Sequence, residues 1–229
     1  MKKIVGLLVA FVFFASGCAE IETKQQAYPK MYSETEKPVS ILVVPAINKS
    51  TAADAADLIN STLTIPFADN GYYVLPISIV SDIFKRDGII EGSQIAGLPA
   101  SVFKTNFGVD SVLYITINKW DTNYIVIAAN VTVGMSYVLV SATTNEVLWS
   151  YDQQIVVDTA GDSTGFILAD IVKTAVATAL TDYIPIARQV NAAAVSTLPY
   201  GNYHPLVGTD GEMKVVLKAS KEKALNQTE

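Results

Sequence analysis

The chain has 229 residues, of which 50% are hydrophobic and 17% are charged, so it can bury a core and is not intrinsically disordered. Its formal net charge is −6, and an acidic chain is a poor ligand for nucleic acid. A single cysteine and a single histidine exclude a zinc cluster of the Cys/His type and any intrachain disulfide.

The first residues have the pattern of an export signal. Lys2 and Lys3 supply positive charge, residues 4–14 form an apolar run, and small residues follow. A membrane-spanning helix needs about 20 apolar residues, and this run is shorter. We therefore expect residues 1–17 to be a signal peptide, and we expect no helical span further along the chain.

The small residues before Cys18 resemble the bacterial lipobox, in the form Ala15-Ser16-Gly17-Cys18. The resemblance implies cleavage before Cys18 and acylation of its thiol and new amino group. Because Ala19 is not the Asp that marks inner-membrane retention in such proteins, the resemblance favours the outer membrane. The alternative is an ordinary secretory signal with an incidental cysteine.

The remaining chain divides by composition into three parts. Residues 18–38 are polar and have no sustained period, which predicts a flexible tether that spans about 25 Å on average. Residues 39–198 contain the periodic apolar segments of a globular domain. Residues 199–229 form a tail rich in Pro, Gly and Tyr, with a short apolar run at residues 213–217.

The domain opens with a pattern typical of a parallel β-α-β unit. Residues 39–45 are apolar and rich in β-branched side chains, as in a buried parallel strand. Residues 52–70 have helical spacing, although Pro66 should kink or end the helix near Ile65. Residues 72–75 form the next strand, and shorter helices are expected at residues 77–86 and 99–107.

Three strands joined by short connections follow, at residues 111–120, 124–140 and 146–157. Short connections indicate antiparallel neighbours, and a turn is expected at residues 121–123. The middle strand alternates apolar and polar residues, and a long helix with an apolar stripe over residues 167–183 should cover its apolar face. The predicted fold class is α/β (α+β), with a single mixed sheet, a parallel opening, an antiparallel three-stranded meander and helices packed on the sheet.

Two sets of motifs carry a resemblance to known families. The segment Ile41–Ser50, the helix after it and Gly71-Tyr-Tyr-Val-Leu-Pro76 resemble the opening of curli-secretion (CsgG)-like and TolB N-terminal-like lipoprotein domains. With Phe107-Gly-Val-Asp110 and Tyr203-His-Pro205, they look more narrowly like a family of bacterial outer-membrane lipoproteins of unknown function. The resemblance implies a lipid-anchored, periplasm-facing domain with no established catalytic residue.

One motif admits a catalytic interpretation. Gly161-Asp-Ser-Thr-Gly165 fits the G-x-S-x-G nucleophile pattern, and Asp170 or Asp182 and then His204 follow in the order of an α/β-hydrolase. However, the strand before Ser163 belongs to an antiparallel meander, and no Gly-rich oxyanion segment follows an earlier strand. We expect these residues to cap the long helix instead. No catalytic, metal-binding or cofactor-binding residue is predicted, and no cofactor.

The sequence thus favours an envelope lipoprotein, anchored through Cys18, that works by contacts with other envelope lipoproteins or with copies of itself. Tyr72, Tyr73, Tyr200 and Tyr203 are candidate contact residues, with partial burial as the alternative. Two other functions stay open: a subunit of a CsgG-like oligomeric secretion channel, which would depend on residues 111–140, and a lipoprotein regulator of peptidoglycan synthesis.

Overall fold

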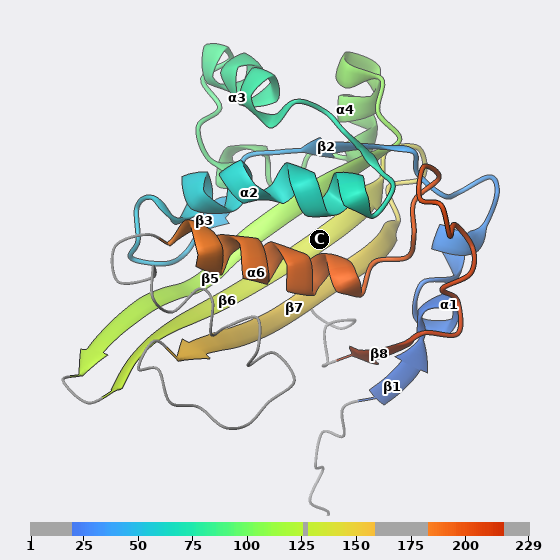
Figure 1. The fold of residues 1–229 in the computed structure, drawn as a ribbon. Helices are drawn as coiled ribbons and strands as arrows, with labels where there is room; N and C mark the ends of the chain where they lie inside the picture. Colours follow the sequence, from blue (N-terminus) through green and yellow to red (C-terminus); the bar gives the residue numbers. More distant parts are fainter. Residues whose placement is uncertain (1–19, 126–127, 159–182, 218–229) are drawn as a thin grey trace, which may run out of the picture.

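The computed structural model describes residues 20–125, 128–158 and 183–217. The expected signal peptide, Cys18, the motif at residues 161–165 and the expected helix over residues 167–183, up to residue 182, lie outside the described residues. So does the end of the expected tail, from residue 218. The described residues form a mixed sheet with helices packed on it, which confirms the predicted fold class (Figure 1).

The main sheet has six strands, and its order along the hydrogen-bonded path is β4-β2-β5-β6-β7, with β3 also paired to β5. The strands are β2 (Ser40–Val43), β3 (Ile47–Asn48), β4 (Tyr73–Val74), β5 (Ser111–Ile125), β6 (Ala128–Ser141) and β7 (Val147–Asp158). Strand β2 pairs in parallel with β4 and β5, whereas β5, β6 and β7 are antiparallel neighbours. The parallel opening and the antiparallel meander are both confirmed.

The hairpin between β5 and β6 is longer than expected. The turn predicted at residues 121–123 is wrong, because β5 runs on to Ile125 and Asp121 pairs with Thr132 across the ladder. Asp, Thr and Asn favour turns locally, but cross-strand pairing overrides that preference here. A register shift between Ile117 and Lys119 marks an irregularity in the ladder, which is typical of a β-bulge.

After residue 38, the helices among the described residues are α2 (Ala55–Asp69), α3 (Ile77–Arg86), η2 (Gly92–Ile95), α4 (Ala100–Phe107) and α6 (Ile184–Ser196). Pro66 does not end α2 near Ile65, since the helix continues to Asp69 and Pro66 lies in its last turn. Helix α4 ends at Gly108, which takes the left-handed conformation that closes a helix. No helix among the described residues is long and apolar enough to cross a membrane.

Two apolar clusters hold the layers together. On one face, α2 and α6 lie over the sheet (Figure 1) and bury the alternating side chains of β6, namely Val131, Val133, Met135, Tyr137 and Leu139. The cover that the sequence predicted, a helix over residues 167–183, lies outside the described residues up to residue 182, and among the described residues α2 and α6 lie on this face. A second cluster joins α3 and α4 to the other face through Leu42, Val112 and Val140.

The segment expected to be a flexible tether is folded from residue 20. It contains β1 (Glu20–Thr23), α1 (Lys24–Ala27) and η1 (Pro29–Tyr32). Tyr28 and Met31 are buried in the larger apolar cluster, and β1 pairs with β8 (Lys214–Leu217), a strand from the expected tail. The described parts of the expected tether and of the expected tail thus fold together with the domain of residues 39–198.

Candidate functional site

The two ends of the described chain meet in one structure, which we call the terminal clasp and define as residues 20–27 together with residues 198–217. Strands β1 and β8 pair antiparallel, from Glu20 opposite Leu217 to Thr23 opposite Lys214. The pairing extends into the loop, where the Lys24 N–H donates to the Met213 carbonyl at 2.8 Å. Thr23 begins α1 with a capping box that it shares with Gln26.

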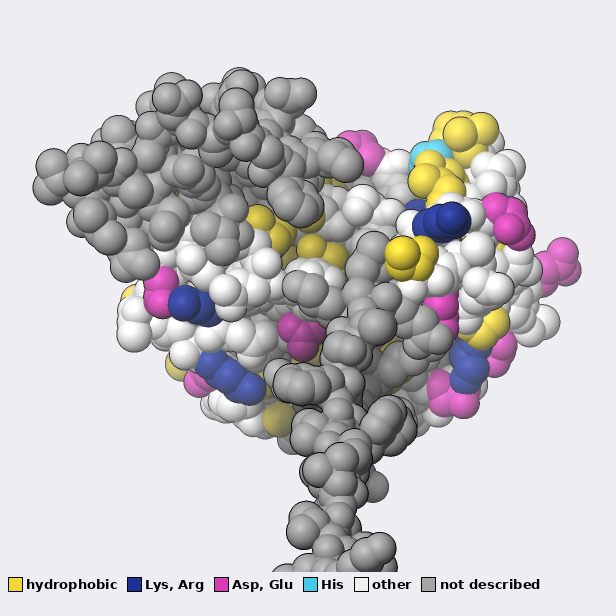
Figure 2. Space-filling model, turned by 90° about the horizontal axis from the view of Figure 1, so that it is seen from below, with side chains coloured by type: hydrophobic (Ala, Val, Ile, Leu, Met, Phe, Trp, Pro, Cys, Tyr) yellow, Lys and Arg dark blue, Asp and Glu magenta, His cyan; other side chains and the backbone are white. Residues whose placement is uncertain are grey.

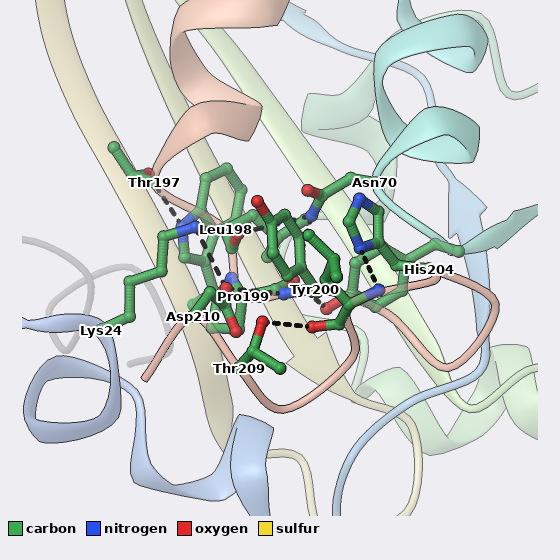
Figure 3. Close-up of polar contacts among 12 residues, drawn as sticks. Lys24, Asn70, Thr197, Leu198, Pro199, Tyr200, His204, Thr209 and Asp210 are labelled. Atoms are coloured by element: carbon green, nitrogen blue, oxygen red, sulfur yellow. Dashed lines mark hydrogen bonds and ion pairs between the residues drawn. The ribbon is translucent and has the colours of Figure 1, made fainter. Parts of the chain in front are cut away.

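A buried ion pair lies at the centre of the terminal clasp. Lys24 Nζ is 3.2 Å from Asp210 Oδ2, and the two side chains are 3% and 0% exposed. The same ammonium group donates to the Leu198 carbonyl at 2.9 Å and lies 5.2 Å from the centre of the Tyr200 ring. Asp210 Oδ2 also accepts the Tyr200 N–H at 2.9 Å. Figure 3 shows these groups converging from α1 and from the C-terminal loop.

Electrostatics in the terminal clasp follow from burial. Burial lowers the pKa of Lys24, and the charge of Asp210 opposes that shift. Burial raises the pKa of Tyr32, and the charge of Asp210 adds to the effect, so the two groups are near each other. Nevertheless the Tyr32 hydroxyl and Asp210 Oδ1 are buried without a hydrogen-bond partner of good geometry among the described residues.

A close approach of two glycines joins the terminal clasp to the main sheet. The Gly201 N–H donates to the Asn70 carbonyl at 2.8 Å, and the Tyr203 N–H donates to the Gly71 carbonyl at 3.1 Å. Gly71 has a φ of +90°, and a Cβ atom on it would overlap the backbone of His204. Two of the motifs that carry the resemblance therefore lie against each other although they are far apart in the sequence. They are Gly71-Tyr-Tyr-Val-Leu-Pro76 and Tyr203-His-Pro205.

Tyr72 and Asn70 fix the start of the C-terminal loop. The Tyr72 hydroxyl donates to the Pro199 carbonyl at 2.7 Å, and the Asn70 side-chain amide donates to the same carbonyl at 3.0 Å. The rings of Tyr200 and His204 are stacked at 3.7 Å, and His204 Nδ1 accepts the Leu206 N–H at 3.1 Å. These contacts order the loop.

The third motif of the resemblance is also structural. In Phe107-Gly-Val-Asp110, Val109 is buried in the second apolar cluster. Asp110 Oδ2 accepts the backbone N–H groups of Val39 and Ser40 and the Ser40 hydroxyl, at 2.9 to 3.2 Å. Asp110 thus fixes the entry of the chain into β2.

The candidate contact tyrosines divide into two kinds. Tyr73 and Tyr203 are exposed, as a contact role requires. Tyr72 is buried, so its expected place on the surface is wrong, and Tyr200 is half-buried against His204. The nucleophile candidate Ser163 lies outside the described residues. Within the described parts of the chain, no group of three His, Cys, Asp or Glu residues is placed to hold a metal ion.

Sequence reasoning missed the residues that are most specific to the terminal clasp. Lys24 and Asp210 are separated by 186 positions, and each stands among polar residues that indicate a solvated segment. It also missed Asn191, which is fully buried and joins α6 to α2 and β6. Its side-chain oxygen accepts a hydrogen bond from the Tyr137 hydroxyl at 2.6 Å, and its side-chain N–H donates to the Thr62 hydroxyl at 2.9 Å. The feature of the sequence that could have indicated this role is a single Asn within the otherwise largely apolar helix of residues 184–196.

The role of this site is structural, because its buried ion pair joins two segments of the chain. The charges of Lys24 and Asp210 neutralise each other, and removing one member of a buried pair costs far more than removing a surface pair. The arrangement therefore holds the N-terminal segment against the domain.

Comparison with known proteins gives the class of the chain. The family described as "Putative lipoprotein GNA1162-like" matches residues 30–204. Together with the fold, this match defines the class of the chain as a lipoprotein family with a mixed α/β domain. The chain belongs to the GNA1162-like family. This agrees with the narrower resemblance to a lipoprotein family, while the resemblance to CsgG-like and TolB N-terminal-like domains stays a prediction.

Two relatives illustrate the match. The chain is 29% identical over 184 residues to "Putative lipoprotein NMB1124/NMB1162" of Neisseria meningitidis serogroup B, an alignment that covers 80% of this chain and 84% of the relative. The crystal structure of lipoprotein GNA1162 from Neisseria meningitidis is similar at a TM-score of 0.52 and 29% identity, covering 63% of this chain and 100% of that one. Lys24 and Asp210 lie outside the residues that the family matches.

Proposed function

We propose that this protein is an envelope lipoprotein, acylated at Cys18, anchored in the outer membrane and facing the periplasm, where it acts through protein contacts without catalysis. The observation that carries the proposal is the family match, together with the place of the single cysteine in the lipobox-like Ala15-Ser16-Gly17-Cys18. Two or three acyl chains on one residue make an anchor effectively permanent, because each buried methylene contributes about 0.8 kcal/mol.

A surface suited to protein contacts lies on α3 and α4. Ile79 and Ile83 are exposed one turn apart on α3, and Leu98 and Val102 are exposed just before and within α4. Exposed apolar side chains that gather on one surface mark interaction sites more often than isolated ones do. This surface supports a role in binding other envelope proteins.

The ionisable groups of the terminal clasp support a structural rather than a catalytic role. Lys24 and Asp210 are each other's partners, and His204 already uses Nδ1 as an acceptor within its own loop. A general base needs an acceptor directed at a substrate, and these groups are directed at the protein.

Two experiments test the anchoring. Mass spectrometry of the protein from its own cells should find acyl groups on Cys18 and no leader, and Cys18→Ser should move the protein from the membrane to the soluble fraction. A bare thiol in the native protein would refute the anchoring.

A photo-crosslinking residue at Ile79 should capture envelope proteins in intact cells, whereas the same residue at Leu206, which is similarly exposed on the terminal clasp, serves as the matched control. Equal capture at both positions, or none at Ile79, would contradict the contact surface. Capture of a peptidoglycan synthase would favour the regulator alternative. The channel alternative needs the apolar face of β6 free for lipid, and Val133, Met135, Tyr137 and Leu139 are fully buried there.

A further inference from the structure

We infer that the terminal clasp holds the domain directly on the phospholipid surface, with the exposed side chains of Ile21 and Met213 against the headgroups. The inference rests on the proposed acylation of Cys18. It replaces the flexible spacer expected from the sequence with a fixed orientation of the domain on the bilayer.

The length of chain between the anchor and the fold is the first argument. Cys18 precedes Glu20, the first residue of β1, by two positions. Two extended residues span at most about 7 Å, compared with about 25 Å for the tether predicted from residues 18–38. If Cys18 carries the lipid, the start of β1 lies at the membrane surface.

The attachment of β1 to the rest of the molecule is the second argument. The β1–β8 ladder, the Lys24–Asp210 pair and the burial of Tyr28 and Met31 all bind this segment to the domain. For the segment to act as a spacer, the ladder would have to separate and two buried charges would have to part. The first described strand after the anchor, β1, is therefore held to β8 and to the domain.

The surface chemistry of this edge fits a lipid headgroup layer. Ile21 is 63% exposed and Met213 is 48% exposed, and Lys214, which is exposed, pairs with Thr23 in the same ladder. Figure 2 shows the face of the molecule that lies at the bottom of Figure 1, where hydrophobic side chains stand among charged ones. Exposed apolar side chains of this kind are typical of a membrane interface. The same edge carries Glu22 and the exposed Glu212 beside Lys214, so the apolar side chains rather than a net positive charge support the contact.

The orientation that follows directs the α3–α4 surface away from the bilayer. In Figure 1, α3 and α4 lie at the end of the molecule opposite β1 and β8. Ile79 is 60% exposed and Leu98 is 45% exposed, so these residues match Ile21 and Met213 in exposure and differ from them in position.

The test uses the acylated full chain in vesicles of phosphatidylethanolamine and phosphatidylglycerol that carry a nitroxide on the headgroup. Because the chain has one cysteine and acylation consumes its thiol, an introduced cysteine is the only site for a fluorescent label. The variants are Ile21→Cys, Met213→Cys and the control Leu98→Cys. We expect the nitroxide to quench the label at positions 21 and 213 several-fold more than at position 98.

The outcomes separate the inference from the proposed function. Quenching at position 21 without quenching at position 213 would overturn the inference and leave the anchor intact. No quenching at position 21 would overturn the anchoring at Cys18 as well. Equal quenching at positions 213 and 98 would overturn the orientation. Adding Asp210→Ala to Met213→Cys should reduce quenching at position 213 in a protein whose circular dichroism is unchanged.

Discussion

Replacing Lys24 by Met tests whether the buried ion pair locks the terminal clasp. Met keeps much of the apolar stem of Lys24 and removes the ammonium group that lies 3.2 Å from Asp210 and 2.9 Å from the Leu198 carbonyl. Asp210 then keeps the Tyr200 N–H as its hydrogen-bond donor and becomes a buried charge that has lost its ion-pair partner, although its charge still acts on Lys37.

The expected loss is about 3–5 kcal/mol in the free energy of unfolding, the usual cost of breaking a buried pair from one side. For a protein of this size that corresponds to a fall of about 6–20 °C in the melting temperature. The assay is urea unfolding followed by circular dichroism and by tryptophan fluorescence. Trp149 is a useful reporter because its Nε1 donates to Thr197, next to the start of the terminal clasp.

Lys30→Met is the matched control, since Lys30 pairs with Glu146 on the surface, where the two side chains are 32% and 51% exposed. Its expected cost is about 0–1 kcal/mol. A double variant, Lys24→Met with Asp210→Asn, should recover part of the loss because no unpaired charge stays buried. Equal effects of Lys24→Met and Lys30→Met would refute the reasoning.

Three further predictions concern the core, the glycine contact and pH. Tyr137→Phe leaves the Asn191 carbonyl without its 2.6 Å donor and should cost about 1–3 kcal/mol in urea unfolding, whereas the exposed Tyr203→Phe should change little. Gly71→Ala should destabilise the protein more than Gly88→Ala, although both have positive φ, because only at Gly71 does a Cβ meet other atoms; equal melting temperatures would contradict this. Burial raises the pKa of Tyr151 to about 12. An unfolded tyrosine ionises near pH 10. Between pH 10 and pH 12 Tyr151 therefore ionises in the unfolded chain but not in the folded one, which lowers the free energy of unfolding by up to about 2 kcal/mol, whereas below pH 10 there is no such loss. Unfolding free energies measured from pH 9 to 12 should show this fall, and Tyr151→Phe should reduce it.

The sheet was predictable because local patterns and tertiary environment agree there. The alternation in β6 places Val133 and Met135 on the face that α2 and α6 bury, and the apolar run at residues 39–45 contains β2, which pairs in parallel with β4 and β5. Where one face of a strand is buried, apolar and polar residues alternate along it, and this alternation is visible in the sequence.

The terminal clasp was not predictable for the opposite reason. Strand β1 is four residues long and alternates Glu, Ile, Glu and Thr, a composition that fits a solvated linker as well as a strand. Its partner lies almost 200 positions away in β8, and no single-chain pattern connects Lys24 to Asp210. Pairing between distant segments, rather than local preference, decided this part of the fold.

The pairing of β1 with β8 also affects the order in which the protein folds. Thr23 and Lys214 are almost 200 positions apart, so they cannot pair until nearly the whole polypeptide is present. Closing so long a loop is entropically costly, so this pairing is expected late in folding. A chain that stops before position 214 would complete the main sheet and still leave its first strand without a partner.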